Sequence, residues 1–202
     1  MIGIYPNPAT MREQYFIFLD IDGTLVDFEY GQRVRGPFFS FDENTVLNPE
    51  SIEALNLLIQ SLEQTYDTRL VLTSGRRENL RAFVKNLYDN GLKYDRPITC
   101  TPLEEGRRGQ KIIDFMMTSS LPKYPKLQKV VDYLLRRYAD HGYKNYVVLD
   151  NDVSKIRYEI PPERRIVTNA KKRALQPYQV EKYLISNNLP IKYSEDLAQQ
   201  KQ

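Results

Sequence analysis

The 202-residue sequence contains one cysteine, one histidine and no tryptophan. A single cysteine excludes a disulfide framework and a cysteine-rich zinc site. A single histidine, His141, argues against metal sites and catalytic triads that depend on histidine. We expect Cys100 to be a buried strand residue, because a free cysteine behaves as a small hydrophobic side chain.

The sequence also lacks a hydrophobic run long enough to cross a membrane, which would take about 20 apolar residues. Residues 1–11 lack a charged segment followed by an apolar core, so we expect no signal peptide. The net charge of +3 is small. It accommodates an anionic substrate without requiring a nucleic acid or a membrane as partner. These absences predict a cytosolic-type protein without a membrane span, and they leave its oligomeric state open.

A chain of this length, 41% hydrophobic, predicts one well-packed domain. We expect an irregular lead-in over residues 1–14, the domain over 15–189, and a tail or linker over 190–202. Short apolar runs predict strands at 15–19, 70–72, 97–101, 146–149 and 165–168. Apolar residues at helical spacing predict helices at 49–62, 80–87, 112–116, 125–138 and 177–184. This alternation predicts an α/β fold with a parallel sheet and helices on both faces.

Two aspartates, Asp20 and Asp22, follow the first predicted strand directly. Residues two apart on an extended backbone point the same way, so the two carboxylates converge. Such a pair requires a compensating cation or proton. Ligands of open α/β sheets bind outside the carboxyl ends of the strands, where this pair lies. The alternative is that Asp20 only opens an ordinary turn.

The stretch Asp20-Ile21-Asp22-Gly23-Thr24 resembles the first motif, DxDGT, of the haloacid dehalogenase-like (HAD) phosphohydrolases. The resemblance implies a three-layer Rossmann-like fold and hydrolysis of phosphomonoesters through an aspartyl-phosphate. Asp20 would be the nucleophile. Asp22 would protonate the leaving oxygen and then activate the attacking water. The family also implies a Mg²⁺ cofactor, held by Asp20 and by the backbone carbonyl of Asp22.

The end of the second predicted strand, Leu72-Thr73-Ser74-Gly75-Arg76, resembles the second motif of the family. Its hydroxyl and the neighbouring backbone N–H groups would bind the phosphoryl oxygens. Ser74 is preferred to Thr73 for this role because it directly precedes Gly75. The alternative is that Ser74 is a helix N-cap with no ligand.

The end of the fourth predicted strand, Leu149-Asp150-Asn151-Asp152, resembles the acidic fourth motif. By this resemblance Asp150 would complete the Mg²⁺ site, with Asp152 as a further ligand candidate. Many family members carry two adjacent acids here, whereas this chain has Asn151 in the second place. The order of the outer ligands is therefore left open.

The third motif of the family is a lysine or arginine that neutralises the phosphate and the nucleophile. The lysines of Pro122-Lys123-Tyr124-Pro125-Lys126 lie just before a predicted helix, so Lys123 is our first choice and Lys126 the second. Arg108 and Lys111 remain further candidates. Any of these side chains is also compatible with a solvated surface charge.

Residues 28–48 mix aromatic, glycine and charged residues, which predicts a loop or small flap beside the site, with Arg33 and Arg35 as candidate substrate contacts. This segment and residues 102–122 are both too short for a large cap domain. Capless members of the family tend to act on macromolecules, which help to exclude water from the site.

We expect a phosphoprotein substrate, with phosphotyrosine suited to the aromatic flap. The alternative is a phosphatase that processes RNA or DNA ends. Arg107-Arg108-Gly109, residues 146–150 and residues 165–168 are similar to a capless branch linked to RNA repair. The small net charge argues against nucleic acid. A third interpretation is a non-catalytic phosphate-binding module on the same fold.

Overall fold

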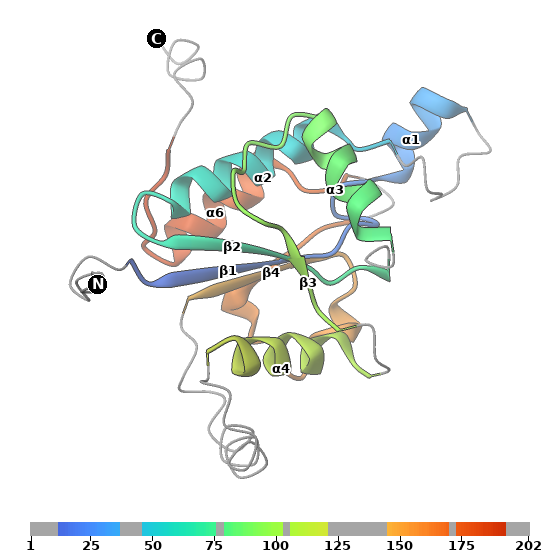
Figure 1. Cartoon of the computed structure of the whole chain (residues 1–202). Coiled ribbons are helices and arrows are strands. Elements are labelled where there is room, and N and C mark those ends of the chain that lie inside the picture. The colour runs from blue at the N-terminus through green and yellow to red at the C-terminus, as the bar shows by residue number, and fades with distance from the viewer. Residues whose placement is uncertain are drawn as a thin grey trace, which may run out of the picture.

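A five-stranded parallel sheet forms the centre of the molecule, with strand order β3-β2-β1-β4-β5 (Figure 1). The computed structural model describes residues 12–36, 46–75, 79–102, 106–120, 145–169 and 173–192. The strands are β1 (Gln14–Leu19), β2 (Asp67–Leu72), β3 (Thr99–Cys100), β4 (Tyr146–Asp150) and β5 (Arg165–Val167). The predicted α/β fold with a parallel sheet is confirmed. Cys100 lies in a strand as expected, although it is half-buried.

The register of the three central strands aligns their carboxyl ends. Leu19 of β1 pairs with Leu72 of β2 on one side and with Leu149 of β4 on the other. The next residues along these strands are Asp20, Thr73 and Asp150. Hydrogen bonds continue one step further, from the N–H of Asp20 to the carbonyl of Leu149 and from the N–H of Thr73 to the carbonyl of Leu19. Polar residues from three strands therefore meet at one edge of the sheet.

Helices cover both faces of the sheet, as the alternating pattern predicts. The helices are α1 (Phe28–Arg35), α2 (Pro49–Leu62), α3 (Leu80–Asp89), α4 (Arg108–Ser120) and α6 (Pro177–Ser186). α2, α3 and α6 lie on one face and α4 on the other (Figure 1). Two 3₁₀ helices, Val153–Lys155 and Pro162–Arg164, follow β4.

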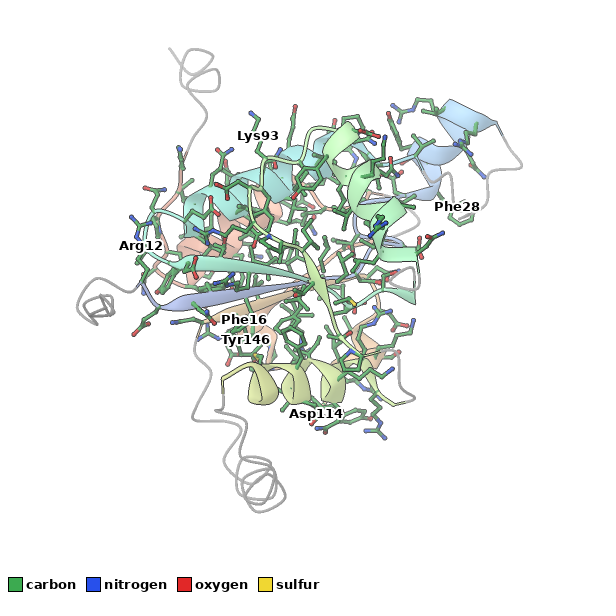
Figure 2. All side chains as sticks on the ribbon, viewed as in Figure 1. Arg12, Phe16, Phe28, Lys93, Asp114 and Tyr146 are labelled. Carbon is green, nitrogen blue, oxygen red and sulfur yellow. The ribbon has the colours of Figure 1, made fainter. Side chains whose placement is uncertain are left out.

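Each face of the sheet has its own hydrophobic core. The larger core joins β1, β2 and β4 to α2, α3 and α6. The smaller core contains Phe18, Val148, Ile112 and Met116, and Figure 2 shows its members Phe16 and Tyr146 on the side of the sheet that faces α4. After the exposed Gln14, the β1 side chains are buried on both faces, which explains why residues 15–19 form an uninterrupted apolar run.

The predicted loop over residues 28–48 is wrong for its first part, because Phe28–Arg35 form α1. Asp27 caps this helix by accepting a hydrogen bond from the N–H of Tyr30 at 2.6 Å. Gly31 is its one buried residue, so the helix lacks the apolar stripe by which helices are recognised. Arg33 and Arg35 lie in its last turn, where cations complement the helix dipole. Residues 37–45 lie outside the described part of the chain.

The other predicted helices agree with the structure or fall outside it. Asn48 caps α2 and Pro49 begins it, as expected. α4 is longer than the short helix predicted, and the helix expected over 125–138 lies outside the described residues. Between β1 and β2 the described residues form only α1 and α2, and so contain no cap-sized domain. None of the described helices is long and apolar enough to cross a bilayer. The expected domain limits stay a prediction.

Candidate active site at the carboxyl ends of β1 and β4

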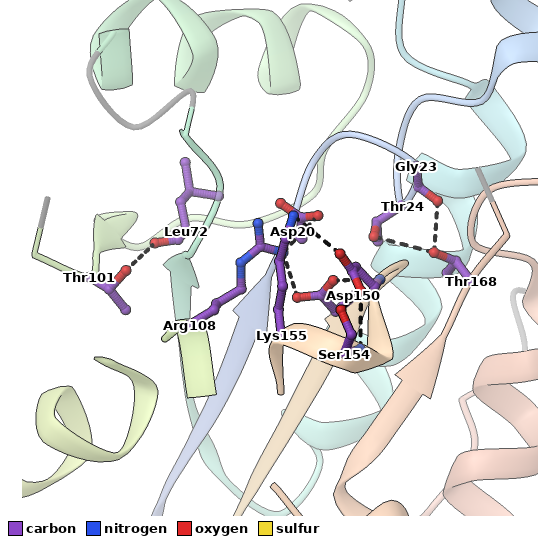
Figure 3. A network of polar contacts seen from close by, with 11 residues as sticks. Asp20, Gly23, Thr24, Leu72, Thr101, Arg108, Asp150, Ser154, Lys155 and Thr168 are labelled. Atoms are coloured by element: carbon purple, nitrogen blue, oxygen red, sulfur yellow. Dashed lines mark hydrogen bonds and ion pairs between the residues drawn. The ribbon is translucent and has the colours of Figure 1, made fainter. Parts of the chain in front are cut away.

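A buried cluster of two carboxylates and one guanidinium lies at the carboxyl ends of the central strands (Figure 3). Arg108, the first residue of α4, places its Nη1 atom 2.9 Å from Oδ2 of Asp20 and 2.5 Å from Oδ2 of Asp150. Asp20 is 3% exposed and Asp150 is fully buried. Two buried carboxylates at this separation would repel each other strongly, so the guanidinium between them compensates their charge.

The pKa values of Asp20 and Arg108 are shifted by burial and by the charges of the other members of the cluster. Burial raises the pKa of Asp20 to about 6, Arg108 opposes this rise, and the charge of Asp150 adds to it. Burial alone would lower the pKa of Arg108, but Asp20 and Asp150 outweigh it and raise that pKa. The arginine therefore stays charged and holds the two carboxylates in one place.

The loop after β1 positions Asp22 through a set of backbone contacts. Gly23 has a φ of 79°, a conformation that glycine adopts without strain. Its carbonyl accepts a hydrogen bond from Oγ1 of Thr168, which follows β5, at 2.7 Å. The N–H of Leu175 donates to the carbonyl of Thr24. The loop that carries the half-buried Asp22 is thus fixed by chain segments about 145 residues away in sequence.

Asp150 and Asp152 differ in their surroundings. The N–H of Asp152 donates to Oδ1 of Asp150 at 2.8 Å, which leaves Oδ2 of Asp150 to Arg108. Asp152 caps the 3₁₀ helix that follows, accepting from the N–H and the hydroxyl of Ser154. Its pKa is lowered, first by the Ser154 hydroxyl and further by Lys155. The role of Asp152 as a metal ligand stays a prediction.

The predicted phosphate-binding residues lie beside Asp20. Thr73 and Ser74 are buried at the carboxyl end of β2, whereas Gly75 is exposed. Thr73 and Gly75 line a cavity of about 450 Å³ together with Arg108. The structure therefore places the second-motif residues next to the carboxylate cluster. Their binding of phosphate stays a prediction.

The structure places Arg108 in the cluster. From the sequence alone, Lys123 and Lys126 are preferred to Arg108 as the cation of the third motif. Both lysines lie outside the described residues, so the structure does not test them. The sequence does carry a signal for Arg108. Gly106 has a positive φ of 137° and ends the connection from β3, and Arg108 begins the helix after it. From this first position of α4, the Arg108 side chain reaches the carboxyl ends of β1 and β4.

The carboxylate cluster has a donor set that suits Mg²⁺. The ion prefers one or two carboxylates, completed by phosphate oxygens and water. Asp20 and Asp150 already converge on a single cationic nitrogen. Among the described residues, no group of three or more acidic, histidine or cysteine side chains is arranged to hold a metal by itself.

One known family model matches most of the chain. Residues 16–180 match the family model described as the HAD domain in Swiss Army Knife RNA repair proteins. This range contains Asp20, Arg108 and Asp150 and all five strands except the first two residues of β1. No curated protein matches the chain. The family match confirms the HAD resemblance, and it favours the nucleic-acid alternative over the phosphoprotein substrate that we expected.

Proposed function

The chain belongs to the family of HAD domains in Swiss Army Knife RNA repair proteins, and on that premise we propose that it is a Mg²⁺-dependent phosphatase acting on nucleic-acid ends. The family match favours the substrate, and the observation that carries the phosphatase activity is the cluster of Asp20, Asp150 and Arg108 at the carboxyl ends of β1 and β4. It combines a nucleophile, a second carboxylate and a cation in a site that suits a phosphate ester.

In the proposed reaction, a carboxylate oxygen of Asp20 attacks phosphorus and the bond from phosphorus to the ester oxygen breaks. Asp22 donates its proton to that leaving oxygen. Asp22 then takes a proton from water, which attacks the aspartyl-phosphate and releases inorganic phosphate and free Asp20. Asp22 ends the cycle protonated, as it began. The hydrogen bond from Thr168 to the carbonyl of Gly23 supports this division of roles, because it fixes the loop that carries Asp22.

Asp20 and Asp150 would hold Mg²⁺ through their carboxylates, and Asp22 through its backbone carbonyl, with Asp152 as a further candidate. The ion would neutralise the phosphate oxygens during the reaction. We assign Arg108, rather than Lys123, as the cation that neutralises the nucleophile and phosphate, because it contacts Asp20 directly. Ser74 and Gly75 at the end of β2 would bind the transferred phosphoryl oxygens.

The proposal is tested by phosphate release in Mg²⁺ from matched substrate panels. One panel contains RNA and DNA oligonucleotides with a 3′- or 5′-phosphate, and the other contains peptides phosphorylated on tyrosine, serine or threonine. We expect release from the oligonucleotides, and loss of release in Asp20→Asn with the circular dichroism spectrum unchanged. Release from the peptides alone would support a protein phosphatase instead. Release from neither panel by the folded protein would support a non-catalytic phosphate-binding module.

The metal assignment has its own test. We expect a chelator to abolish phosphate release and added Mg²⁺ to restore it, because the single charge of Arg108 cannot balance two carboxylates and a phosphate dianion. Activity measured against free Mg²⁺ concentration should rise to saturation in the wild type. Asp150→Asn should shift that curve to higher Mg²⁺, since it removes one of the two carboxylates. Activity that is indifferent to chelator would exclude the metal from the mechanism.

A further inference from the structure

A basic cavity opens beside the nucleophile and extends the site beyond one phosphate. Its volume is about 450 Å³, and four cationic side chains line it: Arg107, Arg108, Lys111 and Lys155. Figure 3 shows Lys155 and Arg108 near Asp20. In the proposed reaction, Asp20 and Arg108 already act on the transferred phosphate. The other three cations are left without a role in the proposed reaction.

The charges of these side chains remain largely available to a ligand. Arg108 is compensated by two buried carboxylates. The side chain of Arg107 is 69% exposed and lies 3.8 Å from Glu159, and the Nζ atom of Lys155 lies 3.3 Å from Asp152. The Lys155 pair is partly exposed and therefore weak, and the Arg107 pair is long, although the Glu159 side chain is only 15% exposed. Glu159 and Asp152 therefore reduce the positive charge of the cavity wall without cancelling it.

An exposed aromatic ring continues this wall. Tyr158 is 67% exposed, and two arginines hold its ring. The Cζ atom of Arg107 lies 5.3 Å from the ring centroid and that of Arg157 lies 4.6 Å from it. Arg157 also donates a hydrogen bond to the Tyr158 hydroxyl at 2.6 Å. The ring is thus oriented at the surface rather than buried in a core.

Gly109 permits this arrangement. A Cβ atom on Gly109 would lie 2.5 Å from Oε2 and 3.0 Å from Cβ of Glu159, closer than real side chains approach. The glycine therefore lets the segment that carries Tyr158 pack directly on the first turn of α4. This contact places the tyrosine next to Arg107, one residue from the arginine that holds the nucleophile.

We propose that Tyr158 and the cations Arg107, Lys111 and Lys155 form a nucleotide subsite, which binds the nucleotide preceding the terminal phosphate of a single-stranded end. Bases of single strands stack on aromatic rings and on arginine planes, and basic grooves follow the backbone phosphates. Tyr158 stacks the base, and the three cations neutralise the adjacent phosphodiester. This subsite rests on the proposed nucleic-acid phosphatase function, and it explains how the site binds a polymer.

Equilibrium binding of a labelled single-stranded RNA hexamer with a terminal phosphate tests the subsite. All variants carry Asp20→Asn, so that the RNA is not consumed. Tyr158→Ala removes the ring, Tyr158→Phe keeps it, and Tyr178→Ala is a matched control because Tyr178 is equally exposed but lies on α6, which packs on the opposite face of the sheet from α4. We expect Tyr158→Ala to weaken binding roughly tenfold. The Tyr158→Phe and Tyr178→Ala proteins should bind as tightly as the parent.

The salt dependence of RNA binding tests the cations separately. Removing one cation that neutralises a backbone phosphate should reduce the slope of log Kd against log salt by about 0.7. We expect this reduction in Arg107→Gln and in Lys155→Gln, and an unchanged slope in Tyr158→Ala. An unchanged affinity in Tyr158→Ala, or unchanged slopes in both charge variants, would overturn the subsite.

The outcomes separate the subsite from the proposed function. If the wild type releases phosphate from oligonucleotides while Tyr158→Ala binds RNA normally, the subsite is wrong and the phosphatase function stands. If the protein neither binds the hexamer nor releases its phosphate, both are wrong. Binding of a phosphopeptide that depends on Tyr158, without binding of RNA, would overturn the nucleotide subsite and assign the surface to a protein substrate.

Discussion

The Arg108 guanidinium lies between two buried carboxylates that would repel each other without it. Asp20 and Asp150 come from different strands, and a single Nη1 atom contacts both. Removing one member of a buried ion cluster is strongly destabilising because the remaining charges are left uncompensated. A bound divalent cation would compensate the same two carboxylates. Arg108 and such an ion would therefore stabilise the fold through the same pair of side chains.

This overlap predicts how Arg108→Ala will behave. In a chelator we expect the free energy of unfolding to fall by roughly 3–5 kcal/mol. In millimolar Mg²⁺ the loss should be smaller, because the ion replaces the missing positive charge. Urea denaturation under both conditions measures the two values. Arg107→Ala is the control, since its exposed side chain should change stability by less than about 1 kcal/mol. An equal loss with and without Mg²⁺ would contradict a shared carboxylate site.

At the scale of the elements, the start of α1 is fixed by the side chain of Asp27. Asp27 caps α1 through the N–H of Tyr30 and accepts a hydrogen bond from Nδ2 of Asn48, the cap of α2, at 2.6 Å. The N–H of Ala174, in the segment before α6, also points to Asp27 at 3.5 Å. A buried carboxylate thus joins the starts of two helices to a third segment of the chain.

Replacing Asp27 by alanine should therefore destabilise more than a helix cap alone. Loss of a cap costs about 1 kcal/mol, and the buried amide of Asn48 would lose a charge-assisted partner, which costs a further 1–3 kcal/mol or so. Urea denaturation should show a combined loss of about 2–4 kcal/mol. Glu29→Ala, in the first turn of the same helix, should lose only a few tenths of a kcal/mol. Similar losses for both variants would mean that Asp27 acts only through the helix dipole.

The elements also show what local sequence predicts and what it misses. The strands and α2 follow from apolar runs and from the Asn48-Pro49 start, because buried elements leave a hydrophobic pattern. α1 leaves none, since nearly all of its side chains face solvent. Its signals are Asp27 at the start and Gly36 at the end. A prediction that also requires an apolar stripe inside the helix therefore misses α1, although both of its end signals are present.

The positions of some site residues follow from the sequence, whereas that of Arg108 does not. Asp20, Ser74 and Asp150 were predictable because residues that follow parallel strands meet at one edge of the sheet. Arg108 belongs to a helix that begins after β3, at the edge of the sheet, and its distance to Asp20 depends on how that helix packs. Sequence spacing therefore makes Arg108 one candidate among several, and only the packing of α4 distinguishes it.

At the scale of the whole molecule, two buried tyrosines connect the sheet to its helices. The hydroxyls of Tyr15 in β1 and Tyr183 in α6 lie 2.7 Å apart, and each lies 3.3 Å from the carbonyl of Tyr146 in β4. Burial raises the pKa of both phenols, and for Tyr15 the neighbouring Tyr183 raises it further. Both tyrosines therefore keep their protons in the folded protein at a pH where an exposed tyrosine loses its proton.

This difference predicts a loss of stability in base. Above about pH 10 the unfolded chain releases the phenolic protons and the folded chain does not, so rising pH favours unfolding. Tyr15→Phe should lose about 1 kcal/mol at pH 8 through its missing hydrogen bond. Its stability should then fall less steeply than that of the wild type between pH 10 and 11.5. The difference between the two slopes approaches about 1.4 kcal/mol per pH unit.

Chemical denaturation across this pH range measures both effects. Tyr178→Phe is the control, because it removes a phenol that is 65% exposed on α6. Parallel stability curves for the wild type and Tyr15→Phe would show that Tyr15 ionises normally in the folded state.

The adjacent arginines at the start of α4 restrict how this part of the chain can evolve. Arg108 is buried against Asp20 while Arg107, one residue before it, faces Tyr158 at the surface. Successive helical residues point about 100° apart. Shifting the first turn of α4 by one residue would leave the composition unchanged, yet it would turn a different side chain toward the nucleophile. The contact therefore requires both an arginine and its place at the first position of α4.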